Sequence, residues 1–267
     1  MQLSEFLEAI AALQLITCQP LSTTKTNNPV HPREHLPDLT EWTGIKRDIK
    51  KLLDPKLGFE VSPFSGTRLA DFIRTDAGRA TSCSDESGVS ALGNKAYENP
   101  ALVILENFFG IIGRFCYHGE RGKGKFVLEW EAPWALATPD NLIEEFNSGR
   151  LSNGRPTKLV KAVSQLYGYM TFNNMRIGAL CNYESLYLFQ RVGSSGLQVS
   201  PPFKFSDRGT ESPVAALVYI CHHVVTVGSF HHSPIGQGPP GTHMLKIEDF
   251  VVRGTWKGKG YTEILRE

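Results

Sequence analysis

Two carboxylates separated by one residue stand out in the stretch FVLEWEAPW, residues 126–134. The stretch alternates as a strand does, and successive side chains of a strand point to opposite faces, so Glu129 and Glu131 lie on the same face. That face also holds Val127, and two carboxylates on an apolar face are costly unless they are solvated, paired or bound to a cation. Carboxylate oxygens are ligands that Mg²⁺ prefers. The pattern therefore predicts either a solvated edge strand or a magnesium site at Glu129 and Glu131.

A helix predicted over residues 156–172 carries polar side chains that could serve the same site. Gln165 and Tyr169 are one turn apart and share a face of this helix, and Lys161 lies one turn earlier on that face. A pair of predicted strands joined by a tight turn follows the helix. Gln165 and Tyr169 either contribute to the acidic site or pack the helix against the sheet, and the residues alone do not separate these alternatives.

The order of these segments resembles the core of the PD-(D/E)XK, or restriction-endonuclease-like, nuclease superfamily. The runs EWEAPW, AVSQLYGYM and GALCNYESLYLFQR are similar to the nuclease domains of Crinkler-type effectors of fungi and oomycetes and of fungal nuclease–kinase proteins, and the similarity covers residues 97–227. The resemblance implies carboxylates that hold a divalent metal, a lysine that orients the attacking water, and DNA or RNA as the substrate. It also implies that Gln165 lies near the acidic strand.

Two positions depart from the motif of that superfamily. The motif opens with proline-aspartate and closes with E-x-K; Glu129 matches the glutamate, whereas Glu131 stands in place of the lysine. The counterpart of the proline-aspartate is Pro100 followed by Ala101, which lacks the metal-binding carboxylate. Phosphodiester cleavage develops negative charge that a metal ion and a cation must offset, so both departures weaken catalysis.

Other residues could replace the lost groups. Glu98 or Glu106 could supply the missing carboxylate, with Glu131 as a second metal ligand. Lys161 or Lys125 could supply the missing cation. With these replacements the chain would be a magnesium-dependent nuclease, and without them it would be a nuclease-like fold that binds without cleaving.

The loop GERGKGK, residues 119–125, imitates a nucleotide-binding P-loop but departs from it. Phe126 follows where the motif needs Ser or Thr, and the loop leads into a predicted strand rather than a helix, so we expect no nucleotide site. Arg121, Lys123 and Lys125 either contact a phosphate backbone beside the acidic strand or form a solvated turn.

Five of the eight histidines, beginning with His222 and His223, fall in residues 222–243. A zinc or nickel site needs three or four converging ligands, but these two neighbours on a predicted helix point about 100° apart. Neither HExxH nor CxxC accompanies them. We therefore expect a surface loop and one packed histidine rather than a metal site.

Charge and cysteine content exclude several classes of protein. The chain has 28 Lys and Arg against 27 Asp and Glu, which argues against a generally basic nucleic-acid coat but allows a local basic patch. The five scattered cysteines predict neither a disulfide framework nor a thiolate zinc site, and they favour a reducing compartment, the cytoplasm or the nucleus. Glu5 and Glu8 disfavour a secretion signal. The apolar runs at 101–112 and 214–227 are interrupted and shorter than the roughly 18 residues of a membrane span, so we expect no membrane partner.

Apolar spacing predicts an N-terminal helix and polar linker over residues 1–38 and a nuclease-like α/β domain over residues 39–267. The fold class is therefore α/β: a restriction-endonuclease-like mixed central sheet flanked by helices, with a helical N-terminal region. Helices are expected over residues 39–53, 138–146, 156–172 and 213–227, and strands over 100–105, 125–131, 177–183, 186–192, 197–205 and 244–251.

From these observations we predict an intracellular, effector-type protein that binds DNA, or else RNA, on a nuclease-like fold with a degenerate active site. An active Mg²⁺-dependent DNA endonuclease with a rearranged site is the first alternative, and a protein-interaction scaffold is the second. Mg²⁺ is expected as a cofactor only for the active enzyme.

Overall fold

A six-stranded mixed sheet forms the centre of the protein, and the predicted α/β class is confirmed in this computed structural model. The strands lie in the order β1 (Leu39–Glu41), β5 (Gly196–Val199), β4 (Ser185–Val192), β3 (Ile177–Cys181) and β2 (Val127–Trp130), and β6 (Phe203–Lys204) pairs with β4. The structure describes residues 1–11, 38–61, 93–111, 126–131, 133, 136–139, 141–151, 157–172, 175–182, 184–193 and 196–226.

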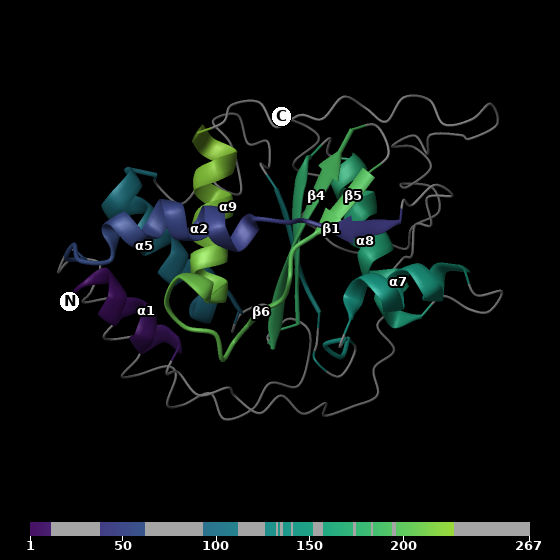
Figure 1. Cartoon of the computed structure of the whole chain (residues 1–267), viewed down its shortest axis with the longest axis horizontal. Coiled ribbons are helices and arrows are strands. Elements are labelled where there is room, and N and C mark those ends of the chain that lie inside the picture. The colour runs from purple at the N-terminus through teal and green to yellow at the C-terminus, as the bar shows by residue number, and fades with distance from the viewer. Residues whose placement is uncertain are drawn as a thin grey trace, which may run out of the picture.

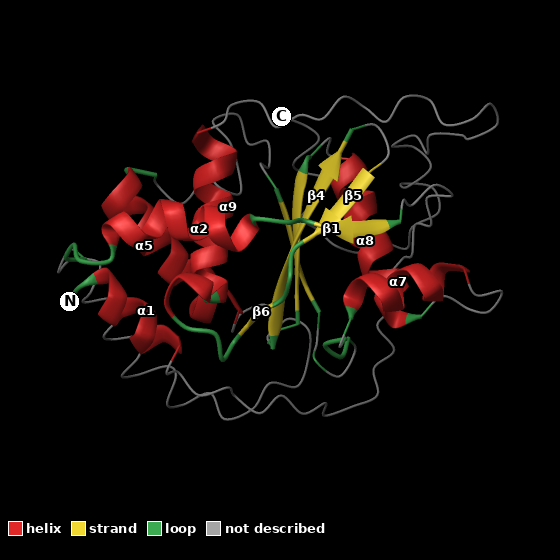
Figure 2. Ribbon diagram, in the orientation of Figure 1, coloured by secondary structure: helices red, strands yellow, loops and turns green. Residues whose placement is uncertain are grey.

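Helices cover both faces of the sheet, which is seen nearly edge-on in Figure 1. One layer contains α1 (Leu3–Ala11), α2 (Ile45–Leu53), α5 (Asn99–Phe109) and α9 (Pro213–Thr226), and the other contains α7 (Leu142–Leu151) and α8 (Lys158–Phe172). Figure 2 shows the same three layers as helix, strand and helix. Such a sheet buries both of its faces, which explains why strands β3 and β4 read as nearly continuous apolar runs.

Alternate side chains of the strands enter two separate hydrophobic cores. Ala179 and Leu188 belong to the core shared with α9, which we call the α9-side core, whereas Leu180 and Phe189 belong to the core shared with α8, the α8-side core. The N-terminal helix α1 is part of this structure, because its apolar stripe lies in the α9-side core; the stripe consists of Leu3, Phe6, Leu7 and Ile10.

The two long helices are confirmed close to their predicted bounds, and capping residues explain where they begin. The Ser212 hydroxyl accepts a hydrogen bond from the backbone N–H of Ala215 at 3.3 Å, and Pro213 occupies the first helical position of α9. The Thr157 hydroxyl accepts from the N–H of Val160 at 3.2 Å and so caps α8. The predicted strand pair after α8 is also confirmed as β3 and β4, which run antiparallel.

Part of the helix predicted over residues 39–53 is wrong, because its first residues form strand β1. Leu39 is buried in the α8-side core, and β1 runs parallel to β5 with Leu39 opposite Leu197. Gly44 has φ +82, a left-handed conformation that favours glycine, and this turn separates β1 from helix α2. The strand is specified by a partner 158 positions further along the chain, which no local pattern reveals.

The strand predicted over residues 100–105 is also wrong, because this segment lies within helix α5. Pro100 occupies the first turn of the helix, where its missing N–H costs nothing. Ala101, Ile104 and Leu105 are buried with the spacing of a helix face. Gly110 ends the helix with φ +63, and its N–H donates to the Leu105 carbonyl.

The helix predicted over residues 138–146 begins later than expected, at Leu142. Thr138 is not its cap: the Thr138 hydroxyl donates to a Glu184 carboxylate oxygen at 3.2 Å. The capping residue is Asn141, whose side-chain oxygen accepts from the N–H of Glu144 at 3.2 Å. The strand predicted over residues 244–251 lies outside the described residues.

Candidate functional site

The acidic strand β2 lies beside β3, and helices α7 and α8 lie between the two strands in the chain. The pair is parallel, with Glu129 opposite Leu180 and Trp130 opposite Cys181. Val127 contacts the α8-side core, whereas Leu128 and Trp130 pack in the α9-side core. The predicted alternation of faces is therefore confirmed, and Glu129 points toward α8.

Gln165 of α8 lies against Glu129, and this contact is the centre of the candidate site. The Gln165 amide nitrogen donates to Glu129 Oε1 at 2.8 Å and also approaches the Tyr169 hydroxyl at 3.4 Å. Gln165 is 7% exposed, so the amide donates in a place from which most water is excluded. A hydrogen bond to a carboxylate in such surroundings is stronger than one between neutral groups. Glu129 and Gln165 are 36 residues apart in the chain, and Gln165 and Tyr169 are 4 apart. The three side chains thus form one polar cluster between strand β2 and helix α8.

Glu131 follows the last residue of β2 and is buried, with 5% of its surface exposed. Its backbone N–H donates to the Cys181 carbonyl at 2.8 Å, which continues the pairing of β2 with β3. A carboxylate at such depth is costly unless other groups compensate it. Glu131 is therefore not a solvated surface residue, contrary to the simplest interpretation of the alternating pattern.

Of the two lysines considered as replacements for the missing cation, the structure describes only Lys161. Lys161 is exposed on α8, and in the described parts of the chain no ion pair joins it to a carboxylate. Lys125 lies outside the described residues, together with Arg121 and Lys123 of the basic loop. Gln165 is thus a neutral hydrogen-bond donor to Glu129 and does not itself replace the missing cation.

The carboxylates considered as substitutes for the lost aspartate lie elsewhere. Glu98 Oε1 accepts a hydrogen bond from the Trp130 indole N–H at 3.0 Å, and Trp130 points to the face of β2 opposite to Glu129. Glu106 is exposed on α5. Pro100 and Ala101, the expected counterpart of the proline-aspartate, lie in helix α5 rather than on a strand.

Sequence reasoning missed the pocket that holds Trp130. Its ring is stacked on Tyr97 with centroids 5.7 Å apart, and Tyr97 in turn meets Phe205 edge-on at 5.7 Å. Gly93 touches the other part of the indole, because a Cβ at Gly93 would come within 2.1 Å of the ring. Trp130 and Glu98 are 32 residues apart in the chain, so no local pattern predicts their hydrogen bond. The sequence signal that could have drawn attention to this pocket is a tryptophan between two acidic residues.

Helix α9 carries His222 and His223, and each contacts an aromatic ring. His222 lies 4.6 Å from the Phe109 ring and His223 is stacked on Tyr219 at 5.5 Å, both between centroids. Burial lowers the pKa of both imidazoles, and Arg176 lowers that of His223 further. Within the described ranges no three His, Cys, Asp or Glu side chains form a group that could hold a metal ion.

Comparison with known proteins gives no relative for this chain: no family model, no curated protein and no solved structure matches it significantly. In the described part of the chain no helix is both long enough and apolar enough to cross a membrane.

Proposed function

We propose that this chain is a nucleic-acid-binding protein of the effector type, built on a restriction-endonuclease-like core that binds DNA, or else RNA, without cleaving it efficiently. The observation that carries the proposal is the 2.8 Å hydrogen bond between Gln165 and Glu129. The resemblance in the sequence implies that this glutamine lies near the acidic strand, and the two segments do meet at these side chains. The parallel pairing of β2 and β3 on either side of α8 supports the same interpretation.

Binding without efficient cleavage follows from the charges. Glu131 occupies the position of the lysine that would stabilise the charge of the transition state, and Lys161 is exposed without an ion pair to a described carboxylate. Two carboxylates repel a phosphate, and only the active enzyme would use a divalent cation to turn this repulsion into attraction. In the active alternative, the carboxylate oxygens of Glu129 and Glu131 are the type of donor that Mg²⁺ prefers.

The proposed contacts to the nucleic acid come from the basic segment that precedes β2 in the sequence. Arg121, Lys123 and Lys125 immediately precede the strand, so their ammonium and guanidinium groups would meet the phosphate backbone. The near-neutral charge of the whole chain means that affinity depends on such local groups rather than on a general positive surface.

The test measures binding of fluorescent duplex DNA and single-stranded RNA by anisotropy between 50 and 200 mM salt, with and without Mg²⁺. We expect wild-type binding whose logarithmic salt slope falls by roughly 2 in Lys123→Gln/Lys125→Gln, since each phosphate contact contributes about 0.9 for duplex DNA. Because Mg²⁺ is expected as a cofactor only for the active enzyme, we expect equal affinity with and without Mg²⁺, and Glu5→Gln, which changes an exposed carboxylate of α1, serves as the control. Absence of binding to either nucleic acid would refute the proposal and leave the protein-interaction scaffold.

An active nuclease is the second candidate, because the bond between Glu129 and buried Gln165 retains part of an organised site. Plasmid and single-strand cleavage with Mg²⁺ or Mn²⁺ decides between the two candidates. Cleavage that disappears in Glu129→Ala and persists in Glu5→Gln would establish a working enzyme, whose missing cation would then be sought at Lys161. Background cleavage in all variants would support binding alone.

A further inference from the structure

The outward face of helix α2 concentrates positive charge. Lys46, Arg47, Lys50 and Lys51 fall within about 140° of the helix circumference at 3.6 residues per turn, in an arc that begins beside the buried stripe of the helix and extends away from it. The Arg47 side chain is 70% exposed and the Lys50 side chain 45% exposed, and Lys51 is exposed as well. We call these four residues the α2 basic face. Like charges three and four residues apart repel one another, so a helix with this pattern benefits from a compensating anion.

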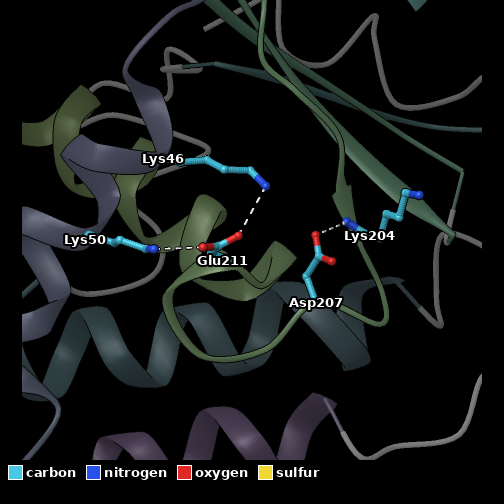
Figure 3. Close-up of polar contacts among 5 residues, drawn as sticks. All are labelled: Lys46, Lys50, Lys204, Asp207 and Glu211. Carbon is cyan, nitrogen blue, oxygen red and sulfur yellow. Dashed lines mark hydrogen bonds and ion pairs between the residues drawn. The ribbon is translucent and has the colours of Figure 1, made fainter. Parts of the chain in front are cut away.

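Three carboxylates partly neutralise this face: Asp48 lies 3.5 Å from Arg47, Asp54 acts on Lys50 through its charge, and Glu211 pairs with two of the lysines. Glu211, from the short 3₁₀ helix η3 (Gly209–Glu211) before α9, accepts from the Lys50 ammonium at 2.8 Å and from the Lys46 ammonium at 3.4 Å. Figure 3 shows Glu211 between the two lysines, one carboxylate oxygen directed to each. The hydrogen bond from Lys50 and the charge of Lys46 lower the pKa of Glu211 below its usual value, so this residue is an anion at neutral pH.

The depression beside this cluster is not itself an anion site. It has a volume of about 500 Å³ and is lined by two cations, Lys50 and Arg208, and by the carboxylates of Glu8, Asp207 and Glu211. Three carboxylates against two cations would repel a phosphate placed inside. The open positive charge lies instead on the helix surface, where Arg47 contacts only its neighbour Asp48, at 3.5 Å, among the ion pairs of the described residues.

We propose that the α2 basic face is a docking surface for the phosphodiester backbone of a nucleic acid, and that Glu211 limits its affinity by holding Lys46 and Lys50. This inference rests on the proposed function and adds a second contact surface, with its own restraint, to that function. Charge complementarity selects the partner: the cations lie together over about one and a half turns of α2, and binding of cations to the phosphate backbone depends on charge and not on base sequence.

Two variants with opposite expected effects test the proposal. In Glu211→Gln the two lysines are released, and we expect nucleic acid to bind about two to five times more tightly, the change in affinity that an exposed ion pair typically represents. In Arg47→Gln/Lys51→Gln we expect weaker binding and a logarithmic salt slope smaller by about 2 for duplex DNA. Neither Arg47 nor Lys51 contacts Glu211, so this double variant keeps the η3 contacts.

The assay is fluorescence anisotropy with labelled duplex DNA and single-stranded RNA at 50 to 200 mM salt, with circular dichroism to verify folding. Glu144→Gln is the matched control, because Glu144 is equally a surface carboxylate but lies on α7, in the other helix layer. Unchanged affinity in Glu211→Gln and in the double variant, beside clear wild-type binding, overturns this inference and leaves the proposed function standing. No binding by any variant overturns both. A poly-glutamate peptide that binds this face more tightly than nucleic acid overturns the choice of partner.

Discussion

Replacing Trp130 by phenylalanine removes one hydrogen bond in the layer that supports the acidic strand, and the cost can be worked out from its contacts. The indole N–H donates to Glu98 at 3.0 Å, in a place where Trp130 is 7% and Glu98 9% exposed. A hydrogen bond to a charged group contributes about 1.5–3 kcal/mol, and the smaller ring loses about 1 kcal/mol of apolar burial. We therefore expect Trp130→Phe to lower the free energy of unfolding by about 2.5–4 kcal/mol, while the stack on Tyr97 persists.

The assay is urea unfolding followed by far-ultraviolet circular dichroism, arranged as a double-mutant cycle with Glu98→Gln. The glutamine keeps an acceptor, so that variant should cost less than Trp130→Phe, and the two together should show a coupling of about 1–2 kcal/mol. Trp42→Phe is the matched control: Trp42 packs on the same core, and its indole has no hydrogen bond among the described residues. A decrease in the free energy of unfolding for Trp130→Phe no larger than for Trp42→Phe would refute the argument. Strictly additive costs of Trp130→Phe and Glu98→Gln would refute it as well.

Three further predictions concern other buried groups. The Tyr187 hydroxyl is buried without a hydrogen-bond partner among the described residues, and burial raises the pKa of Tyr187 to about 12. Tyr187→Phe should therefore leave the free energy of unfolding unchanged or raise it by about 1 kcal/mol. A decrease of more than about 1 kcal/mol would reveal a hidden partner of the hydroxyl. A Cβ at position 178 would lie 2.6 Å from the Met170 sulfur, so Gly178→Ala should cost about 1–3 kcal/mol in the same unfolding assay, and a neutral result would mean that the thioether moves aside freely. His222 and His223 have pKa values lowered by burial, so protonation favours the unfolded state: stability should be complete above about pH 6.5 and fall as the pH drops through the lowered values. The free energy of unfolding, measured between pH 5 and 8, should fall toward low pH in the wild type and depend less on pH in His222→Gln/His223→Gln.

The elements that could be predicted are those whose own residues specify them. Helix α8 combines an apolar face with a threonine cap, and strands β3 and β4 are apolar runs on either side of a short turn. The turn is held by Asn182, whose side-chain oxygen accepts from the N–H groups of Glu184 and Ser185. In these segments local propensity and burial agree, so the pattern alone is sufficient.

The errors arise where a distant partner or an ambiguous apolar run decides the structure. The run that begins at Pro100 is equally compatible with a buried strand and a buried helix, and the left-handed Gly110 that ends α5 was the signal that would have separated them. Strand β1 is three residues long and depends on β5 for its hydrogen bonds.

The candidate site could be predicted only in part. The resemblance implied that Gln165 lies near the acidic strand, whereas the residues alone left open whether it contributes to the site, and the structure places its amide 2.8 Å from Glu129. The burial of Glu131 and the bond between Trp130 and Glu98 could not be predicted, because burial depends on the folded structure as a whole and the bond joins residues 32 positions apart in the chain.

The parallel pairing of β1 with β5 also has a consequence for how the protein is made. Thr40 and Leu197, which meet across this pair, are 157 residues apart in the chain. At about 5–20 residues per second, a ribosome needs roughly 8–30 s to synthesise the intervening segment. During that interval β1 has no β5 to pair with, and Leu39 cannot yet reach its place in the α8-side core. The sheet is therefore completed only late in translation, and β1, with Leu39 exposed, stays unpaired in the nascent chain until then.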